Sequence, residues 1–409
     1  MDFNDTKEEA EFRAEARAFL EANATPKTDK SSNWRAGISE DEALKLGKEW
    51  QAKKVDAGFA QITWPKEWGG RGGTPIQSVI YSQEESNFLV PGGFFEIGLG
   101  MCIPTMMAYA TDEQNKRYVL PALRGEEIWC QLFSEPSAGS DVAGLGTKAV
   151  RDGDEWVING QKVWTSGAHY SDYGIVLTRT NPDVPKHKGL TMFFIDMKSA
   201  GIECRPIKQL SGEANFNEVF FTDVRVPHAQ MLGEEGSGWK VAITTLMNER
   251  LAVGGATGAD VEDLIELARA TELETGPAIK DMDVRQKLAD WYTRGQGLKY
   301  TRFRTITALS KGQQPGPESS IGKVVSAPRL QELSGFALEL MDMAGVMMDK
   351  EATGDTQKFH QSYMWAPGLR IAGGTDEILR NIIAERVLGL PGDIRVDKDV
   401  AYKDLPKGA

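Results

Sequence analysis

The chain has 409 residues, of which 41% are hydrophobic and 26% are charged. This balance is typical of folded globular proteins, and the length predicts two or three domains. The formal net charge of −12 argues against nucleic acid as a partner, because general nucleic-acid binding requires a basic surface. The three cysteines are widely spaced, which favours reduced thiols, and we therefore expect a cytoplasmic protein.

The sequence predicts neither a metal site nor a membrane span. The four histidines are scattered and lack the spacing of metal ligands. The apolar run over residues 94–110 contains Glu96 and Pro104 and is too short to cross a bilayer. The N-terminus has an acidic, helical pattern that does not match a signal peptide.

The N-terminal part is expected to be helical. Residues 6–23 carry apolar side chains at helical spacing. Thr111 and Gln114 form a capping box that opens another helix, which is expected to end at Pro121. These patterns predict an N-terminal helical domain over residues 1–126.

The pattern changes to strands near Ile128. Residues 156–164 are expected to form a hairpin, because Asn159–Gly160 is a strong turn signal. Further runs typical of strands cover residues 175–179, 190–196, 202–207 and 218–226. Together they predict a middle β domain, a small barrel or sandwich, over residues 127–233.

Helical periodicity returns at Trp239 and continues to about Leu388. It predicts a C-terminal helical bundle over residues 234–395, followed by a charged tail over residues 396–409. The fold class is therefore α+β, with a β domain between two helical domains.

Two segments of the middle domain carry groups suited to a cofactor. Residues 132–144 are rich in glycine and hydroxyl side chains, and their backbone amides are expected to converge on an anion. An ordinary turn is the alternative interpretation of this segment. Trp164, Thr165 and Ser166 place an indole beside two hydroxyls, which suits a flat ring with heteroatoms. Together the segments indicate an aromatic cofactor with a pyrophosphate.

These segments resemble, nearly residue for residue, the flavin-binding segments of the acyl-CoA dehydrogenase family. The resemblance extends over essentially the whole chain and implies the family's fold: an N-terminal helical domain, a middle β-barrel or sandwich domain and a C-terminal helical bundle. It also implies FAD bound at a subunit interface. The segments that carry the resemblance are residues 65–72, 134–141, 164–166, 220–227 and 373–378.

The resemblance also implies roles for single residues. Ser134 and Ser140 would contact the flavin or its pyrophosphate, the segment 164–166 would flank the ring, and Thr375 with Glu377 would reach FAD from the bundle. The FAD-binding residues implied are Gln131, Phe133, Ser134, Ser140, Trp164, Thr165, Ser166, Thr375 and Glu377. The substrate-binding residues implied are Ser140, Arg250, Gly373 and Gly374.

The reaction implied by the resemblance is α,β-dehydrogenation of an acyl-CoA thioester to the trans-2-enoyl-CoA. A carboxylate removes a Cα proton, flavin N5 accepts a hydride from Cβ, and the electrons pass to electron-transfer flavoprotein. Much of the family carries the carboxylate directly before the Gly-Thr that matches Gly374–Thr375. This chain has Gly373 there, which leaves space compatible with branched or bulky acyl groups.

Glu249 is the candidate for the catalytic base. On the predicted helix 239–253 it shares a stripe with Ala242 and Leu246, so apolar neighbours are expected to raise its pKa toward that of a working base. A structural ion pair is the alternative interpretation. The resemblance favours catalysis, because isovaleryl- and long-chain-type members carry their base as a Glu-Arg pair that matches Glu249–Arg250.

Two motifs depart from the family pattern. The Arg-x-x-Phe-Gly motif, which holds the FAD pyrophosphate across the subunit interface, is absent from the corresponding residues 270–277. The Gln-x-x-Gly-Gly motif is degenerate near residues 341–345. Assembly therefore stays open between a homotetramer and a heteromer with a related dehydrogenase subunit. The alternative functions are an acyl-CoA oxidase or flavin monooxygenase of the same fold, and a structural subunit of a heteromeric acyl-CoA dehydrogenase.

Overall fold

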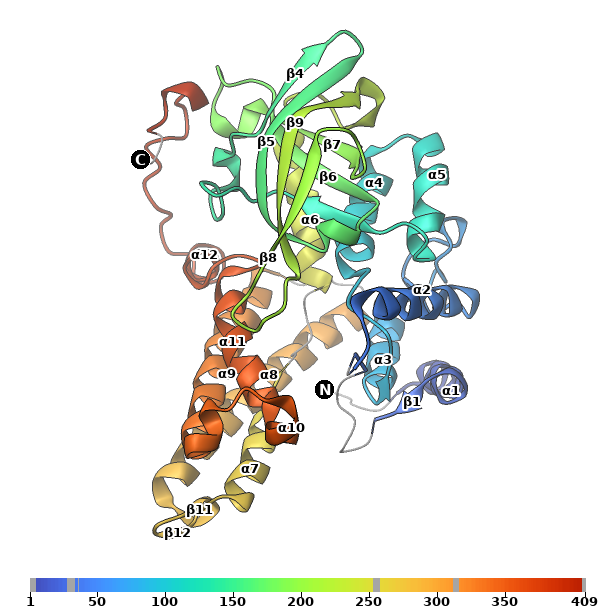
Figure 1. The fold of residues 1–409 in the computed structure, drawn as a ribbon. Helices are drawn as coiled ribbons and strands as arrows, with labels where there is room; N and C mark the ends of the chain where they lie inside the picture. Colours follow the sequence, from blue (N-terminus) through green and yellow to red (C-terminus); the bar gives the residue numbers. More distant parts are fainter. Residues whose placement is uncertain (1–4, 28–33, 36, 253–257, 312–315, 407–409) are drawn as a thin grey trace. The chain divides into compact units, whose positions relative to one another are not determined.

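The computed structural model describes residues 5–27, 34–35, 37–252, 258–311 and 316–406 (Figure 1). The chain forms two compact units, of which residues 1–253 with 394–409 make the first and residues 254–393 make the second. The first unit contains the N-terminal helices and the β domain, and the second is a helical bundle.

The N-terminal part of the first unit is helical, as predicted. Thr111 opens a helix through a capping box, but this helix continues through Pro121 to Leu123 instead of ending at the proline. Proline removes only one backbone donor, and the N–H of Arg124 still reaches the carbonyl of Leu120 at 3.0 Å. The elements here are α1 (Lys7–Asn23), β1 (Thr25–Pro26), α2 (Glu40–Asp56), α3 (Pro75–Glu85), β2 (Phe88–Leu89), a π-helical turn (Gly98–Cys102), α4 (Ile103–Tyr109) and α5 (Asp112–Leu123).

The middle of the chain forms one eight-stranded sheet in the order β10-β7-β6-β4-β5-β9-β8, with β3 paired in parallel to β6. Most other neighbours are antiparallel. The strands are β3 (Trp129–Leu132), β4 (Lys148–Asp152), β5 (Glu155–Ser166), β6 (Tyr173–Arg179), β7 (Leu190–Asp196), β8 (Ile202–Ile207), β9 (Phe216–Pro227) and β10 (Met231–Leu232).

The prediction of a hairpin turn at Asn159–Gly160 is wrong. β5 runs straight through these residues, and the turn that precedes it contains Gly153 instead. Gly160 lies at a register shift between β5 and β9 with a φ of 154°. A Cβ at this position would approach the Thr147 Oγ1 atom to 2.4 Å, so the glycine permits close packing of β5 on the preceding chain.

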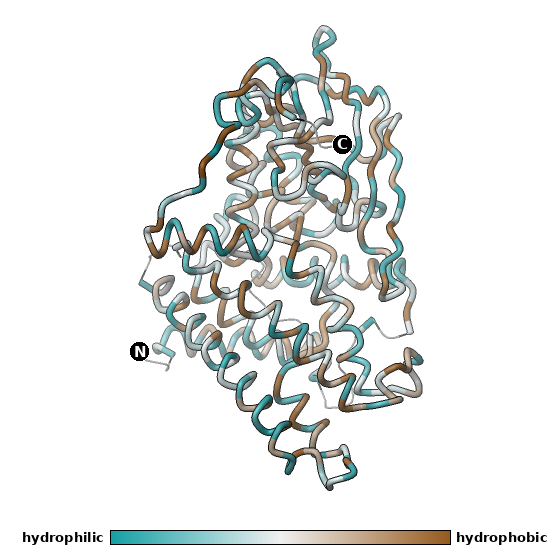
Figure 2. The backbone as a smooth tube through the Cα atoms, turned by 90° about the vertical axis from the view of Figure 1, so that its left-hand side faces the viewer, coloured by the Kyte–Doolittle hydropathy of each residue, from teal (hydrophilic) through white to brown (hydrophobic). Residues whose placement is uncertain are grey.

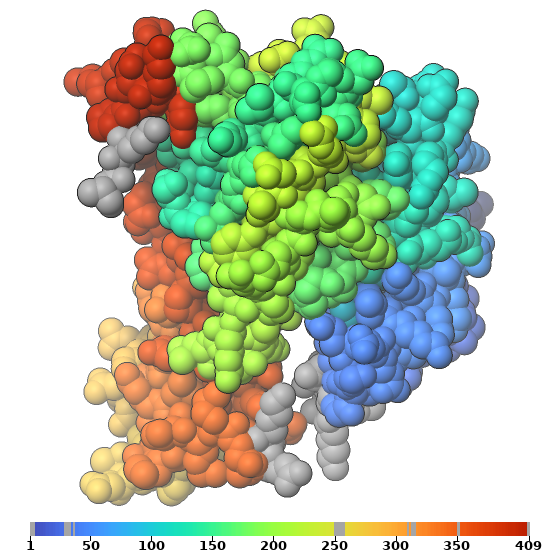
Figure 3. All heavy atoms as spheres, turned by 45° about the horizontal axis from the view of Figure 1, so that its top comes forward, coloured from blue at the N-terminus to red at the C-terminus, as the bar shows by residue number. Residues whose placement is uncertain are grey.

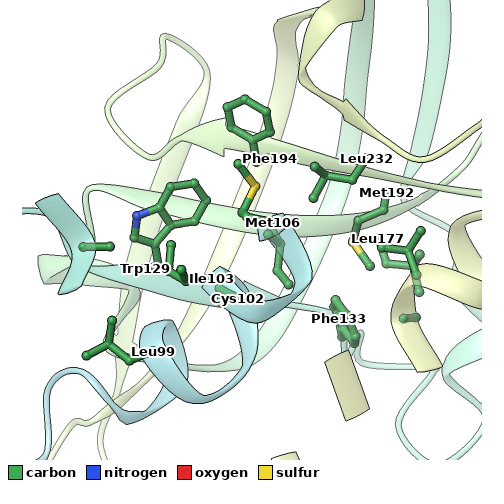
Figure 4. Packing of buried hydrophobic residues seen from close by; sticks show 14 of the residues in the cluster. Leu99, Cys102, Ile103, Met106, Trp129, Phe133, Leu177, Met192, Phe194 and Leu232 are labelled. Atoms are coloured by element: carbon green, nitrogen blue, oxygen red, sulfur yellow. The ribbon is translucent and has the colours of Figure 1, made fainter. Parts of the chain in front are cut away.

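A buried hydrophobic cluster joins the β domain to the helices around it. Figure 4 shows Met106 of α4, Trp129 of β3 and Phe194 of β7 in this cluster. Phe133, directly after β3, belongs to the same cluster and is 5% exposed. The core therefore fixes the point at which the predicted cofactor segment begins.

The helix predicted over residues 239–253 forms as α6 (Gly238–Ala252). It packs against α4, β7 and the π-helical turn, all within the first unit. Its sequence pattern groups it with the C-terminal helices, but its contacts lie within the first unit, with N-terminal helical elements as well as with the β domain. The candidate base is therefore carried by the same unit as the predicted cofactor segments.

The second unit is a bundle whose core joins α7, α8, α9 and α11. Figure 2 shows hydrophilic and hydrophobic residues interspersed along the helices of the chain. Among the described residues, no helix has the length and apolar character needed to cross a membrane. The elements are α7 (Val261–Ala270), β11 (Glu272–Leu273), β12 (Gly276–Pro277), α8 (Met282–Ser310), α9 (Ser320–Leu340), α10 (Lys350–Thr353), α11 (Gln357–Ile371), α12 (Asp376–Ile382) and a π-helical turn (Ile383–Val387).

The charged segment after the bundle, expected as a tail, returns to the first unit. It contains a 3-10 helix, Tyr402–Asp404. In Figure 3 its dark red atoms lie against green atoms of the middle domain.

Candidate functional site

The first predicted cofactor segment follows β3 as a loop. Gln131 lies half-buried within β3, and Phe133 is buried at the start of the loop. Ser134 is partly exposed and Ser140 is exposed. The loop therefore presents its hydroxyl side chains outward while its first residue is held in the core.

A buried ion pair fastens this loop to β5. Lys162 of β5 is fully buried, and its Nζ donates to Glu135 Oε1 at 2.7 Å and to the carbonyl of Phe133 at 3.0 Å. The next residue, Val163, donates its backbone N–H to the carbonyl of Ser134 at 2.9 Å. These bonds join the loop to the part of β5 that directly precedes the second predicted segment.

Glu135 extends the connection to the far end of the loop. Its carboxylate accepts the backbone N–H groups of Gly146 at 2.6 Å and Thr147 at 2.9 Å. Burial raises the pKa of Glu135, but the Lys162 charge and these hydrogen bonds outweigh burial and hold the pKa below its usual value. Burial also lowers the pKa of Lys162 to about 8, against the attraction of Glu135.

The second predicted segment lies at the end of β5, next to Lys162 and Val163. Trp164 has a φ of 60° at a register shift between β5 and β9, and 57% of its surface is exposed. Thr165 is buried, and its carbonyl accepts the side-chain amide of Asn217 at 3.0 Å. Its hydroxyl has no hydrogen-bond partner among the described residues. Ser166 is half-buried.

These residues fit a flavin ring and its phosphates. A large exposed indole offers a face for stacking, and the buried Thr165 hydroxyl lacks the partner that buried polar groups normally have. The adjoining loop supplies exposed serine and backbone amide groups on a fixed frame. An aromatic cofactor with a polar edge would satisfy the hydroxyl that the protein leaves unpaired.

The candidate base is only partly placed by the structure. Glu249 and Arg250 lie in the last turn of α6, but their side chains are outside the described residues. Earlier in this helix, Ala242 is buried and Leu246 is half-buried, in agreement with the predicted apolar stripe. The assignment of Glu249 therefore stays a prediction.

Hydroxyl pairs hold α6 against α4. Thr105 and Thr245 share a hydrogen bond of 2.9 Å that is fully buried, and Tyr109 shares one of 2.9 Å with Thr244. Thr245 lies one helical turn before Glu249. The helix α6, which carries the candidate base, is thus fastened to α4.

The remaining predicted residues lie in the second unit. Gly373 and Gly374 have φ values of 61° and 91°, which glycine adopts without strain. Thr375 caps α12 by accepting the N–H of Ile378 at 3.2 Å. Glu377 is exposed, and hydrogen bonds from its own N–H and from Thr375 lower its pKa.

Charged groups that the sequence analysis did not single out support this glycine turn. Lys323 of α9 donates to the carbonyls of Ala372 and Gly374. Arg370 donates to the buried carboxylate of Asp376 at 2.8 Å. No motif marks these residues, because their partners become neighbours only in the folded bundle.

The region that departs from the family pattern forms a small turn. Glu272–Leu273 and Gly276–Pro277 pair as the antiparallel strands β11 and β12. No arginine lies within this hairpin to take the part of the missing motif. Among the described residues there is also no cluster of histidine, cysteine and carboxylate side chains that could hold a metal ion.

Family models of three protein domains match successive parts of the chain. The N-terminal, middle and C-terminal domains of acyl-CoA dehydrogenase match residues 6–126, 130–224 and 236–388. The chain is 36% identical over 392 residues to acyl-CoA dehydrogenase IpdE1 of Mycobacterium tuberculosis, covering 94% of this chain and 98% of that protein.

A second relative is longer. The chain is 38% identical over 358 residues to acyl-CoA dehydrogenase FadE34 of Mycobacterium tuberculosis, covering 87% of this chain and 48% of that protein. It therefore spans about half the length of FadE34. Among solved structures, a chain of the ChsE4-ChsE5 complex from Mycobacterium tuberculosis matches with a TM-score of 0.77 and 28% identity, covering 96% of this chain and 100% of that chain.

Proposed function

This chain belongs to the acyl-CoA dehydrogenase family, and on that premise we propose that it binds FAD and converts an acyl-CoA thioester to the trans-2-enoyl-CoA. The family's members are flavoproteins, and membership makes the chain an oxidoreductase that acts on acyl-CoA. The observation that carries the proposal is the direct connection between the loop after β3 and the end of β5 through buried Lys162, beside the unpaired hydroxyl of Thr165.

The residues proposed to hold FAD lie on both units. Gln131, Phe133, Ser134 and Ser140 would contact it from the loop after β3, and Trp164, Thr165 and Ser166 from the end of β5. Thr375 and Glu377 of the second unit are proposed to contact FAD from the bundle. When bound, FAD supplies the acceptor for the hydride that leaves Cβ.

Glu249 is the group proposed to take the Cα proton. It lies on α6, which Thr105 and Tyr109 fasten to α4 through Thr245 and Thr244. Ser140, Arg250, Gly373 and Gly374 are proposed to contact the substrate. A glycine at position 373 leaves space beside the thioester for a branched or bulky acyl group.

The proposed partners are an acyl-CoA, electron-transfer flavoprotein and other dehydrogenase subunits. A heteromer is supported by the missing pyrophosphate motif and by the similarity to a chain of the ChsE4-ChsE5 complex. A homotetramer is the alternative. The cytoplasm is the proposed compartment, since the cysteines are unpaired: Cys102 and Cys130 are buried and Cys204 is half-buried.

The proposal is tested by the visible spectrum of the purified protein. We expect a flavin spectrum that is bleached without oxygen by some members of a panel of straight, branched and bulky acyl-CoAs. A protein that stays colourless after incubation with FAD, even with candidate partner subunits present, would contradict the cofactor assignment.

The electron acceptor separates the alternatives. Turnover that depends on electron-transfer flavoprotein supports a dehydrogenase, whereas comparable turnover with oxygen alone indicates an oxidase or monooxygenase. A flavin that no acyl-CoA bleaches, alone or in a heteromer, indicates a structural subunit.

A further inference from the structure

The C-terminal segment over residues 394–406, named the strap below, is built into the first unit. Ala401 forms a β-bridge with Pro185. The backbone N–H groups of Tyr402 and Lys403 donate to the carbonyls of Val184 at 2.9 Å and Pro182 at 3.0 Å. These contacts place the strap beside the connection between β6 and β7.

The side chain of Tyr402 covers a buried arginine. The Arg179 guanidinium lies 3.5 Å from the centroid of the Tyr402 ring and is 4% exposed. Its nitrogens donate to the backbone carbonyls of Ala143 at 2.6 Å and Leu145 at 3.1 Å. Tyr402 therefore shields the group that holds the second half of the predicted cofactor loop.

A second link runs through Lys186. Its Nζ contacts Asp397 of the strap at 2.5 Å and Asp141 of the loop at 2.8 Å. Asp141 directly follows Ser140, which is one of the residues proposed to bind FAD and substrate. One lysine thus ties the strap to the outward-facing end of the same loop.

We propose that the strap is a positioning element of the cofactor loop, acting through Tyr402 on Arg179 and through Asp397 on Lys186. The inner side of the loop is fixed by Lys162 and Glu135, which leaves its outer turn dependent on these two cations. The strap holds both cations in place by covering one and pairing with the other. This inference rests on the proposed function only where it concerns FAD.

The test combines the substitutions Tyr402→Ala and Asp397→Asn and compares the full-length variant with the unchanged protein. Two quantities are measured: the dissociation constant for FAD, from flavin fluorescence, and the hydrogen exchange of the backbone amides of Gly144 and Leu145. These amides donate to the carbonyls of Asp141 and Val142, so they report on the order of the loop itself.

We expect both quantities to change by about tenfold, with weaker FAD binding and faster exchange. A second variant combines Tyr402→Phe with Asp397→Asn. It keeps an aromatic ring over the Arg179 guanidinium, so most of the protection of the loop amides from hydrogen exchange should return. Lys403→Ala is the matched control, because it removes an exposed strap contact to Asp183 that does not reach the loop. It should change either quantity by less than about twofold.

The proposal would be overturned if the loop amides exchanged at the same rate in the combined variant as in the unchanged protein, whatever happens to FAD binding. Faster exchange with unchanged FAD affinity would keep the strap as a support of the loop but overturn its role toward the cofactor. If the unchanged protein binds no FAD, the proposed function fails, and the exchange measurement still decides whether the strap positions the loop.

Discussion

The two regions expected to contact FAD are built in different ways. In the first unit, the loop after β3 and the end of β5 are joined by a fully buried lysine, a buried carboxylate and backbone hydrogen bonds. In the second unit, Gly373 and Gly374 form a turn supported mainly by Lys323 and by the cap of α12. The first region is a platform held together by buried groups of its own unit, whereas the second unit lacks the family's pyrophosphate motif in residues 270–277.

If the chemistry is centred on the first unit, Glu249→Gln should have the largest effect on turnover. The amide cannot accept the Cα proton, and removal of a general base typically costs about 10²–10⁴-fold. FAD binding should be retained, because the platform does not include this side chain. The rate of anaerobic flavin bleaching by an acyl-CoA measures the loss.

Glu235→Gln is the matched control, since Glu235 is an exposed carboxylate just before α6. It should leave bleaching unchanged. If Glu249→Gln keeps near-normal bleaching, the base lies elsewhere, and Asp376 or Glu377 of the second unit becomes the next candidate.

The buried ion pair of the platform predicts that Lys162→Met lowers the free energy of unfolding strongly. The change leaves Glu135 as a buried carboxylate without its cation, which typically costs about 3–5 kcal/mol. Denaturant unfolding measures the loss. Lys148→Met replaces an exposed lysine on the neighbouring strand and should stay within about 0.5 kcal/mol. Equal effects of the two changes would show that the buried pair does not stabilise the platform.

The same pair predicts a pH dependence. The pKa of Glu135 is lowered in the folded state, so its contribution is present above the ordinary carboxyl pKa and is lost as pH falls through the folded value. Below the ordinary carboxyl pKa, the thermal midpoint of the unchanged protein should therefore fall more steeply with decreasing pH than that of Glu135→Gln. Parallel acid profiles for the two proteins would contradict this assignment.

Much of the fold could be predicted from the sequence, because its signals are local. The bounds of β7 and β8 match the predicted ranges 190–196 and 202–207. The turn predicted at Asn159–Gly160 failed because pairing with β4 and β9 overrides the local turn preference, and the glycine serves close packing instead. Period and propensity therefore locate elements better than they locate the turns between them.

The supports of the candidate site could not be predicted in the same way. Lysine in a strand pattern normally indicates a solvent-facing position, and the partner of Lys162 lies 27 residues away in the sequence. The strap looks like a solvated tail for the same reason, since Asp397 and Tyr402 find Lys186 and Arg179 only in the folded unit. The cofactor segments themselves were indicated by their glycine, hydroxyl and indole groups, and the resemblance to a family then implied FAD as the cofactor.

The absence of the family's pyrophosphate motif from the second unit predicts that flavin occupancy depends on the partner subunit. Hydrogen bonds from an arginine to phosphate contribute roughly 1.5–3 kcal/mol, and residues 270–277 lack that arginine. The protein purified alone should therefore hold FAD weakly, and a related subunit that carries the motif should raise occupancy. Size measurement with flavin quantification tests this. A stable homotetramer with one tightly held FAD per chain would show that another residue replaces the motif.

The glycine turn of the second region predicts a smaller effect, on substrate choice. Gly373→Glu places a carboxylate in the space proposed to lie beside the thioester, so bulky or branched acyl-CoAs should lose more kcat/KM than straight short ones. Overfilling of a packed site suggests a difference of about 1 kcal/mol, or about fivefold.

Because Gly373 has a φ of 61°, any side chain there also strains the backbone. Gly373→Ala carries the same strain without the carboxylate and is the control. Gly373→Glu would contradict the prediction if it lowered kcat/KM equally for all acyl groups. Gly373→Ala would do so if it lowered kcat/KM with the same dependence on the acyl group. Either result would show that backbone strain, and not the size of the pocket, determines the effect.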